Sequence, residues 1–169
     1  GTTIIADTGL GFSFESSTRV DSLSLSLSTN LEGRFGGEAD ASDKFNFVND
    51  DVRLTYARDG KNSGFDLAAR YRNFQLEDIE IGDDFDPDVL VLEGGTRESL
   101  AIDLGFDTGR NARTGIEVDL GYREVDYSGV NDPVLRDSET WEIDASGNFA
   151  LTRSLTASVL AGIEQQEED

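Results

Sequence analysis

The sequence predicts an all-β chain that folds as an antiparallel, up-and-down transmembrane β-barrel, with about eight strands in this chain. Three observations predict this fold: apolar and polar residues alternate in repeated segments, the connections between segments alternate in length, and aromatic residues mark the segment ends. The whole chain, residues 1–169, is expected to form one barrel domain or barrel segment.

The alternation is clearest in DSLSLSLSTN, residues 21–30. A helix would scatter Leu23, Leu25 and Leu27 around its circumference, whereas a strand places all three on one face. Segments of roughly nine to eleven residues are expected, which is the length that a tilted strand needs to cross a bilayer. The other alternating segments are residues 8–16, 51–57, 64–72, 99–107, 114–123, 140–149 and 155–163.

The connections between the predicted strands differ in length in a regular order. Tight links are expected after the first, third, fifth and seventh strands, and long links after the second, fourth and sixth, at residues 33–50, 73–99 and 123–139. Outer-membrane barrels have short periplasmic turns and longer extracellular loops, so this order favours a membrane barrel. A soluble sandwich has no reason to sort its loops in this way.

Aromatic residues are predicted to form two belts at the membrane interfaces, because rings collect at the level of the lipid headgroups. The alternative is that they are ordinary strand aromatics in the core of a sandwich. The belt beside the tight turns contains Phe14, Tyr56, Phe106 and Phe149, and the belt at the opposite strand ends contains Tyr71, Tyr122 and Trp141.

The polar faces of the predicted strands carry many charges, which need water or partners because an unpaired buried charge is very costly. In a membrane barrel these residues would line a hydrated interior, whereas in a soluble sandwich they would face solvent. Carboxylates outnumber guanidinium groups, so an open pore is expected to favour cations. The predicted lining residues are Glu15, Ser26, Arg53, Asp66, Arg70, Arg72, Asp103, Glu117, Asp119, Arg123, Glu142 and Asp144.

Two hairpin segments carry a resemblance to a known class of protein. VRLTYARDGKNSGFDLAARYRNF and LGFDTGRNARTGIEVDLGYREVDYSGVNDP resemble porin-like outer-membrane β-barrel proteins of Gram-negative bacteria, of the alphaproteobacterial type. The resemblance implies a location in the bacterial outer membrane, contact with outer-membrane lipid and lipopolysaccharide, and passage of small ions or solutes. It rests on hairpin patterns, so it transfers no functional residue to this chain.

Enzymatic chemistry is not expected. The chain has no His and no Cys, which excludes serine–histidine and cysteine–histidine triads and metal sites built on those ligands. Glu117 with Asp119, or Glu142 with Asp144, could act as an acid and base pair, but a solvated row of charges explains them better. No cofactor is expected, and the net charge of −21 argues against nucleic acid as a partner.

The acidic segment LEDIEIGDDFDPDVLVLE could bind calcium weakly, because hard oxygen ligands lie close together in it. Bound divalent cations could also bridge this loop to lipopolysaccharide phosphates. A solvated loop whose charges repel one another is the preferred interpretation, since the spacing is not that of an EF-hand. The candidate ligands are Asp83, Asp84, Asp86 and Asp88.

Three functions fit the sequence. The first is a passive, cation-favouring diffusion channel or a part of one. The second is a non-transport barrel that displays acidic extracellular loops for adhesion or recognition, and the third is a soluble secreted β-sandwich that binds a partner.

The predicted sidedness also bears on the size of the barrel. If the tight turns are periplasmic, then both Gly1 and Asp169 lie on the extracellular side, whereas outer-membrane barrels keep their termini in the periplasm. The chain is therefore expected to be part of a larger barrel of ten or more strands. Its first and last strands are expected not to pair directly with each other.

Overall fold

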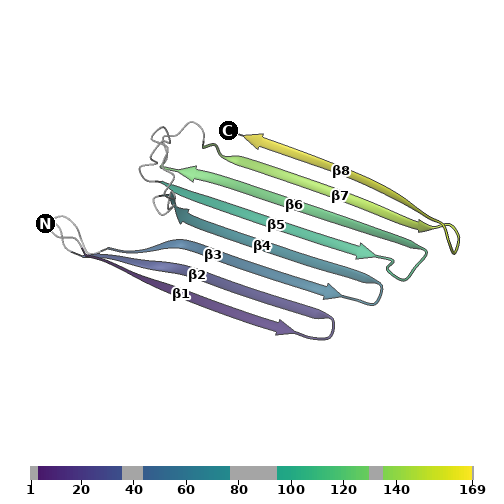
Figure 1. Cartoon of the computed structure of the whole chain (residues 1–169), viewed down its shortest axis with the longest axis horizontal. Helices are drawn as coiled ribbons and strands as arrows, with labels where there is room; N and C mark the ends of the chain where they lie inside the picture. The colour runs from purple at the N-terminus through teal and green to yellow at the C-terminus, as the bar shows by residue number, and fades with distance from the viewer. Residues whose placement is uncertain (1–3, 36–43, 77–94, 130–134, 169) are drawn as a thin grey trace, which may run out of the picture.

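The computed structural model describes residues 4–35, 44–76, 95–129 and 135–168, and these residues form one eight-stranded sheet. All of the strands are long, and they lie side by side in the order of the sequence (Figure 1). The strands are β1 (Ile4–Ser17), β2 (Asp21–Phe35), β3 (Lys44–Asp59), β4 (Ser63–Gln75), β5 (Thr96–Thr108), β6 (Thr114–Ser128), β7 (Ser138–Ala150) and β8 (Thr156–Glu168).

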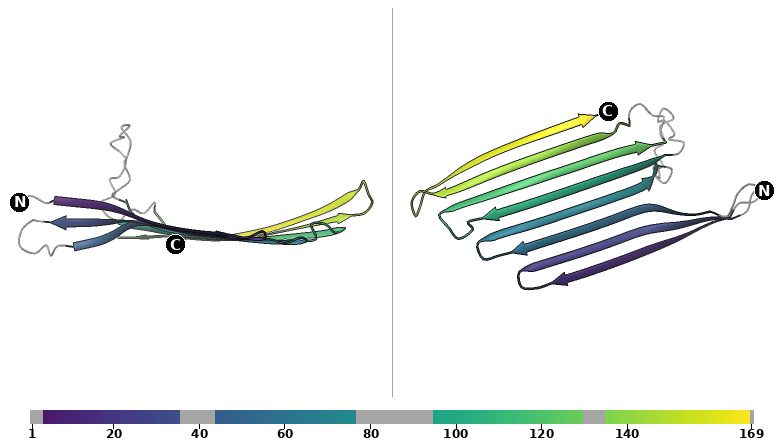
Figure 2. Two further views of the ribbon diagram at one scale, coloured as in Figure 1. Left: turned by 90° about the horizontal axis from the view of Figure 1, so that it is seen from below. Right: turned by 180° about the vertical axis from the view of Figure 1, so that it is seen from behind.

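Every strand pairs antiparallel with its neighbours in the sequence, so the predicted all-β, up-and-down arrangement is confirmed. The sheet does not close on itself in the described part of the chain, because β1 and β8 form its two edges. Viewed from the side, it is a single, gently twisted layer (Figure 2). The predicted barrel closure is therefore not seen, and the expectation that the first and last strands do not pair with each other is confirmed.

The strands contain 13 to 16 residues, so they are longer than the expected length of roughly nine to eleven residues. The extra residues lie mainly at the ends that carry the long connections. Asn73, Phe74 and Gln75 pair with residues 96–98, for example, although they were expected to lie in a long connection. Backbone hydrogen bonds continue the ladder there without an apolar stripe, so alternation of hydrophobicity marks only the middle of each strand.

The pairing places the apolar and polar residues on opposite faces, as predicted. Residues that pair directly in an antiparallel sheet point to the same side, and Leu25 pairs with Leu54 while Ser26 pairs with Arg53. Continued across the sheet, these pairs define an apolar face that contains Leu104 and a polar face that contains Asp103. All seven predicted belt aromatics lie on the apolar face.

A β-bulge interrupts the pairing of β2 with β3. Two residues of β3, Asn49 and Asp50, lie opposite Thr29 between the pairs on either side. Asn49 has a φ of 58°, a left-handed conformation that asparagine tolerates better than most residues. Its side-chain carbonyl oxygen accepts a hydrogen bond from the backbone N–H of Gln75 at 3.2 Å. The extra residue restores the alternation, so Phe47 lies on the apolar face opposite Leu31.

Each tight turn lies farther along the strand direction than the tight turn before it, by a nearly constant step. The last apolar-face pair before the turn is Ser16 with Leu23 in the first hairpin and Phe149 with Ala157 in the last. Direct pairing carries the row of Ser16 across the sheet to Ile143, which lies six residues before Phe149. The advance is therefore about one residue per strand, a slant of roughly 35° for a rise of about 3.3 Å and a strand spacing of about 4.8 Å. Strands in membrane barrels tilt by a similar angle.

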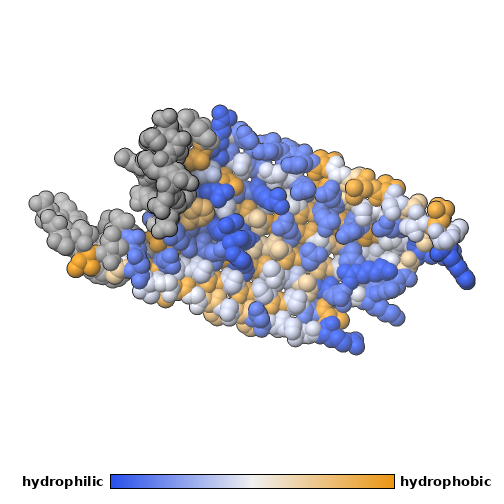
Figure 3. All heavy atoms as spheres, viewed as in Figure 1, coloured by the Kyte–Doolittle hydropathy of each residue, from blue (hydrophilic) through white to orange (hydrophobic). Residues whose placement is uncertain are grey.

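The apolar face is uncovered. Among the described residues, the only buried hydrophobic side chains are Val48 and Leu76, whereas Phe12, Trp141 and Ile163 are 58%, 52% and 74% exposed. Figure 3 shows hydrophilic residues at the tight-turn end of the sheet, together with apolar residues at the β7–β8 turn. Along the β8 edge, it shows a change from apolar residues near the turn to hydrophilic residues toward the C-terminus. The described residues contain no helix long and apolar enough to span a membrane.

The turn between β5 and β6 depends on Gly109. Its φ is +79°, and a Cβ at this position would overlap the carbonyl oxygen of Thr114. We expect Gly109→Ala to lower the free energy of unfolding by about 1–3 kcal/mol, the usual cost of a strained backbone. Urea titration of the protein in detergent micelles measures this change.

Gly11→Ala is the matched control, because an added Cβ there meets only the carbonyl oxygen of Leu27 at 3.9 Å. Equal stability of the two variants would contradict the assignment of strain to the Gly109 turn.

Candidate functional site

The polar face is the candidate functional site, because it gathers most of the charged side chains of the strands. All twelve residues predicted to line a pore lie on this one face. Successive rows of directly paired residues run across the strands, and neighbouring rows on one face are about 6.7 Å apart, the rise of two strand residues. The shared face is confirmed by the pairing, whereas the lining of a pore remains a prediction.

One region of the polar face is rich in arginine. Arg53 and Arg70 lie directly opposite each other on β3 and β4, and both bind the carboxylate of Asp51. The shortest contacts are 3.1 Å from Arg53 Nε to Asp51 Oδ1 and 2.6 Å from Arg70 Nη2 to Asp51 Oδ2. Two guanidinium groups therefore share one carboxylate, which leaves this group of three with a net positive charge.

Three further arginines extend this region toward the long-connection ends of the strands and across the sheet. Arg97 lies over the rings of Phe74 and Tyr127, at 5.5 and 5.8 Å from their centroids, which suits cation–π attraction. Arg123 Nη2 lies 4.0 Å from Asp103 Oδ1. We call the following residues the arginine band: Arg53, Arg70, Arg72, Arg97 and Arg123.

Carboxylates occupy the polar face between the arginine band and the tight turns. They follow one another across the strands, and Asp119 and Asp144 are even direct cross-strand partners. A shallow groove of about 220 Å³ lies among them and is lined in part by Asp66, Asp103 and Gly121. We call the following residues the acidic band: Asp66, Asp103, Glu117, Asp119, Glu142 and Asp144.

Glycines make room for these carboxylates. Asp66 lies directly opposite Gly105, and Asp144 lies opposite Gly162. A Cβ at either glycine would overlap the neighbouring carboxylate. The absence of a side chain therefore lets each carboxylate lean across the adjacent strand, which spreads negative charge over the surface of the sheet.

Two belt aromatics on the apolar face are held by carboxylates. The rings of Tyr122 and Trp141 are 4.4 Å apart between centroids. The hydroxyl of Tyr122 donates to Glu124 Oε2 at 2.8 Å, and Trp141 Nε1 donates to Glu139 Oε1 at 2.7 Å. Each ring therefore has a polar atom directed toward the long-connection ends of the strands and an apolar body beside the aliphatic residues.

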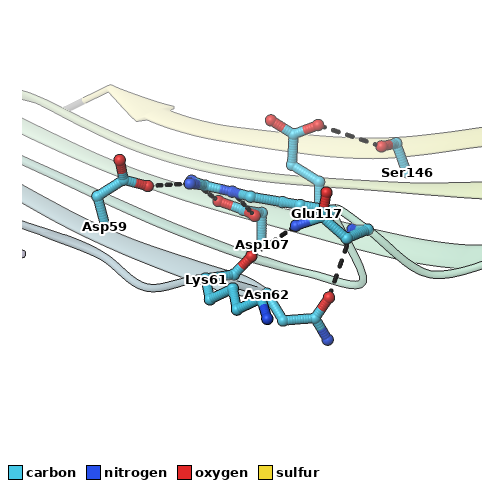
Figure 4. Close-up of polar contacts among 8 residues, drawn as sticks. Asp59, Lys61, Asn62, Asp107, Glu117 and Ser146 are labelled. Atoms are coloured by element: carbon cyan, nitrogen blue, oxygen red, sulfur yellow. Dashed lines mark hydrogen bonds and ion pairs between the residues drawn. The ribbon is translucent and has the colours of Figure 1, made fainter.

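The tight turns are connected to one another. The backbone N–H of Asp59 donates to Val20 O at 2.7 Å, and that of Gly109 donates to Asn62 O at 2.8 Å. Arg110 forms ion pairs with Asp59 and Asp107 and so joins the second turn to the third (Figure 4). The hydrogen bonds that Arg110 donates to Asp107 and then to Asp59 raise the pKa of Arg110 above its usual range, so its side chain stays charged at physiological pH.

Sequence reasoning identified the main residues of the polar face but missed several that the pairing adds. Arg97 continues the period-two pattern beyond its predicted strand, so a longer strand assignment would have included it. Asp51 is the first residue of a predicted strand but was not among the predicted lining residues. Arg110 lies in a turn and gave no signal. The proposed calcium ligands Asp83, Asp84, Asp86 and Asp88 lie outside the described residues. Within the described residues, no cluster of three or more acidic side chains has the geometry to hold a metal ion.

Comparisons with family models, curated proteins and solved structures find no match for this chain.

The Arg110 ion pairs should restrain the two turns that they connect. We expect Arg110→Gln to increase the rate of amide hydrogen exchange several-fold at residues 59–63 and 108–114, because local opening limits exchange in such segments. Mass spectrometry of the exchanging protein measures this rate.

Arg113→Gln is the control, because Arg113 lies in the same turn and makes no ion pair within the described part of the chain. Exchange that rises equally in both variants would mean that loss of positive charge, and not the ion pairs, loosens the turns.

Proposed function

We propose that this chain forms the wall of an outer-membrane β-barrel that acts as a passive, cation-favouring diffusion channel. The observation that carries the proposal is a single staggered sheet with one apolar and one charged face. Such a sheet needs a different environment on each side, and a hydrated pore within a bilayer supplies both.

The apolar face has the features of a lipid-facing surface. Its aliphatic residues lie between Phe106, near the tight turns, and the pair of Tyr122 and Trp141 toward the opposite ends. A soluble sandwich would cover this face with a second sheet about 10 Å away, and the described residues contain only one sheet. Contact with outer-membrane lipid accounts for the exposed apolar side chains without such a cover.

The polar face suits a water-filled interior. Asp103, Asp119 and Glu142 could not lie in a dry core without partners, since their desolvation would be very costly. A closed barrel of only eight strands has an interior just wide enough to be filled by side chains. A conducting pore therefore needs a wider wall than this sheet alone.

The two edges of the sheet support the same conclusion. Within a bilayer, every backbone N–H and C=O must be paired, because the hydrocarbon offers no hydrogen bonds. The outer edges of β1 and β8 have no strand partner among the described residues. The proposed wall therefore includes further strands next to β1 and β8, which makes this sheet part of a larger barrel.

Extraction behaviour tests the membrane assignment. We expect the protein in bacterial envelopes to resist carbonate and high-salt washes and to enter solution only with detergent. A matched washed fraction without detergent is the control. Release by salt or carbonate alone would overturn the membrane proposal and favour a secreted binding module.

The orientation of the two faces is tested by placing a charge on each. Leu104→Arg puts a guanidinium group on the apolar face and should cost about 2–4 kcal/mol if the residue lies near the bilayer midplane. Ser26→Arg puts the same group on the polar face and should cost far less. Urea unfolding in lipid vesicles measures both changes, and a larger cost for Ser26→Arg would reverse the assignment of the faces.

The ion preference of the channel follows from the acidic band. We expect the reversal potential across a planar bilayer to show preference for K⁺ over Cl⁻, because carboxylates that line a pore attract cations. The double variant Asp103→Asn with Glu142→Gln should reduce this preference.

Glu98→Gln is the control, since Glu98 lies on the apolar face opposite Asp126. Anion preference in the unmodified protein would rule out the proposed ion selectivity. A folded protein with no conductance would favour a barrel that displays its loops and does not transport.

A further inference from the structure

The arginine and acidic bands are separated along the strands, and this order has a consequence for permeating solutes. Arg53, Arg70 and Arg123 lie in one row of directly paired residues that contains no carboxylate. The adjacent row toward the tight turns contains Asp103 and Glu142 and no cation. Positive and negative charge therefore meet along a line across the sheet, one row spacing of about 6.7 Å apart.

Small residues lie in both rows where the arginine band and the acidic band meet. Ala101 lies between Arg70 and Arg123 in the arginine row, and Gly121 lies between Asp103 and Glu142 in the acidic row. The groove of about 220 Å³ opens above the acidic row and includes Gly121 in its lining. A small solute can therefore approach the sheet where the two bands meet, within reach of both signs of charge.

The two bands are not neutralised by each other. Asp51 binds Arg53 and Arg70 on the side away from the acidic band, and the closest contact between the bands is the 4.0 Å pair of Arg123 with Asp103. The side chains of that pair are 63% and 55% exposed. Both bands thus keep charge available to a solute in water.

We propose that the arginine band is the specificity-determining element of the channel and makes it favour zwitterionic solutes over uncharged solutes of the same size. A solute such as a dipeptide has its ammonium and carboxylate groups about one row apart. The acidic band attracts the ammonium group while Arg70 and Arg123 attract the carboxylate group. This inference rests on the proposed channel function, and it adds the class of solute and the residues that select it.

The charge order is tested first without transport. The chain has no Cys, so Ala101→Cys in the arginine row and Ser146→Cys opposite Glu117 each introduce a single thiol on the polar face. Each variant, folded in detergent, is treated with a cationic and an anionic methanethiosulfonate reagent. We expect the ratio of anionic to cationic reaction rates to be about tenfold higher at position 101, and the difference to shrink in 1 M salt. Equal ratios at the two positions would overturn the proposal.

The selectivity is tested by osmotic swelling of vesicles that contain the protein. We expect glycylglycine to enter several-fold faster than uncharged N-acetylglycinamide. Arg123→Gln and Arg70→Gln should each reduce this preference, whereas Arg113→Gln in the turn should leave it unchanged. Arg123 is the cleaner change, because its exposed side chain makes one ion pair within the described part of the chain, with Asp103.

The outcomes separate the two proposals. If both solutes enter at equal rates, the channel stands and the selectivity is overturned. If neither solute enters vesicles that contain folded protein, the channel is overturned and the selectivity with it, while the thiol reactions still report whether the bands differ in potential.

Discussion

The strict alternation of side chains along a continuous hydrogen-bonded ladder is the constraint on which the rest of this structure depends. Each strand pairs with its sequence neighbour, so directly paired residues point to the same face at all seven strand interfaces. The register at each interface therefore decides which residues of the next strand lie on the apolar face. A slip of one residue at any interface would move every later apolar residue to the polar face. The bulge at Asn49 shows how the chain absorbs an odd residue without such a reversal.

The same ladder determines where charges meet. Residues distant in sequence, such as Arg53 and Arg123, share a row only because four consecutive strands keep their register. The turns contribute to this register, since each is hydrogen-bonded to the next and Arg110 joins two of them. The electrostatic pattern of the polar face is therefore a property of the whole sheet and not of any one hairpin.

The sequence predicted the strands, their order and the two faces, because these depend on local alternation and on the lengths of the connections. It underestimated the strand lengths, since residues such as Asn73 and Gln75 pair through their backbones and carry no apolar signal. Alternation also predicted which charged residues share the polar face, but not their separation into an arginine band and an acidic band. That separation depends on cross-strand register, and the partner of Asp103 or Arg70 cannot be read from spacing alone. The ion pairs of Arg110 were not predicted, because they depend on two tight turns that lie close together only in the folded sheet.

The regular advance of the turns gives the hairpin the character of a repeating unit. Each hairpin pairs with the next at nearly the same offset along the strands. The two edge strands of a hairpin therefore pair with their neighbouring hairpins in nearly the same geometry. A duplicated or deleted hairpin would therefore leave the slope of the remaining strands unchanged and alter only the width of the sheet. The width of such a sheet can therefore change in steps of two strands, without new turn chemistry or a new core.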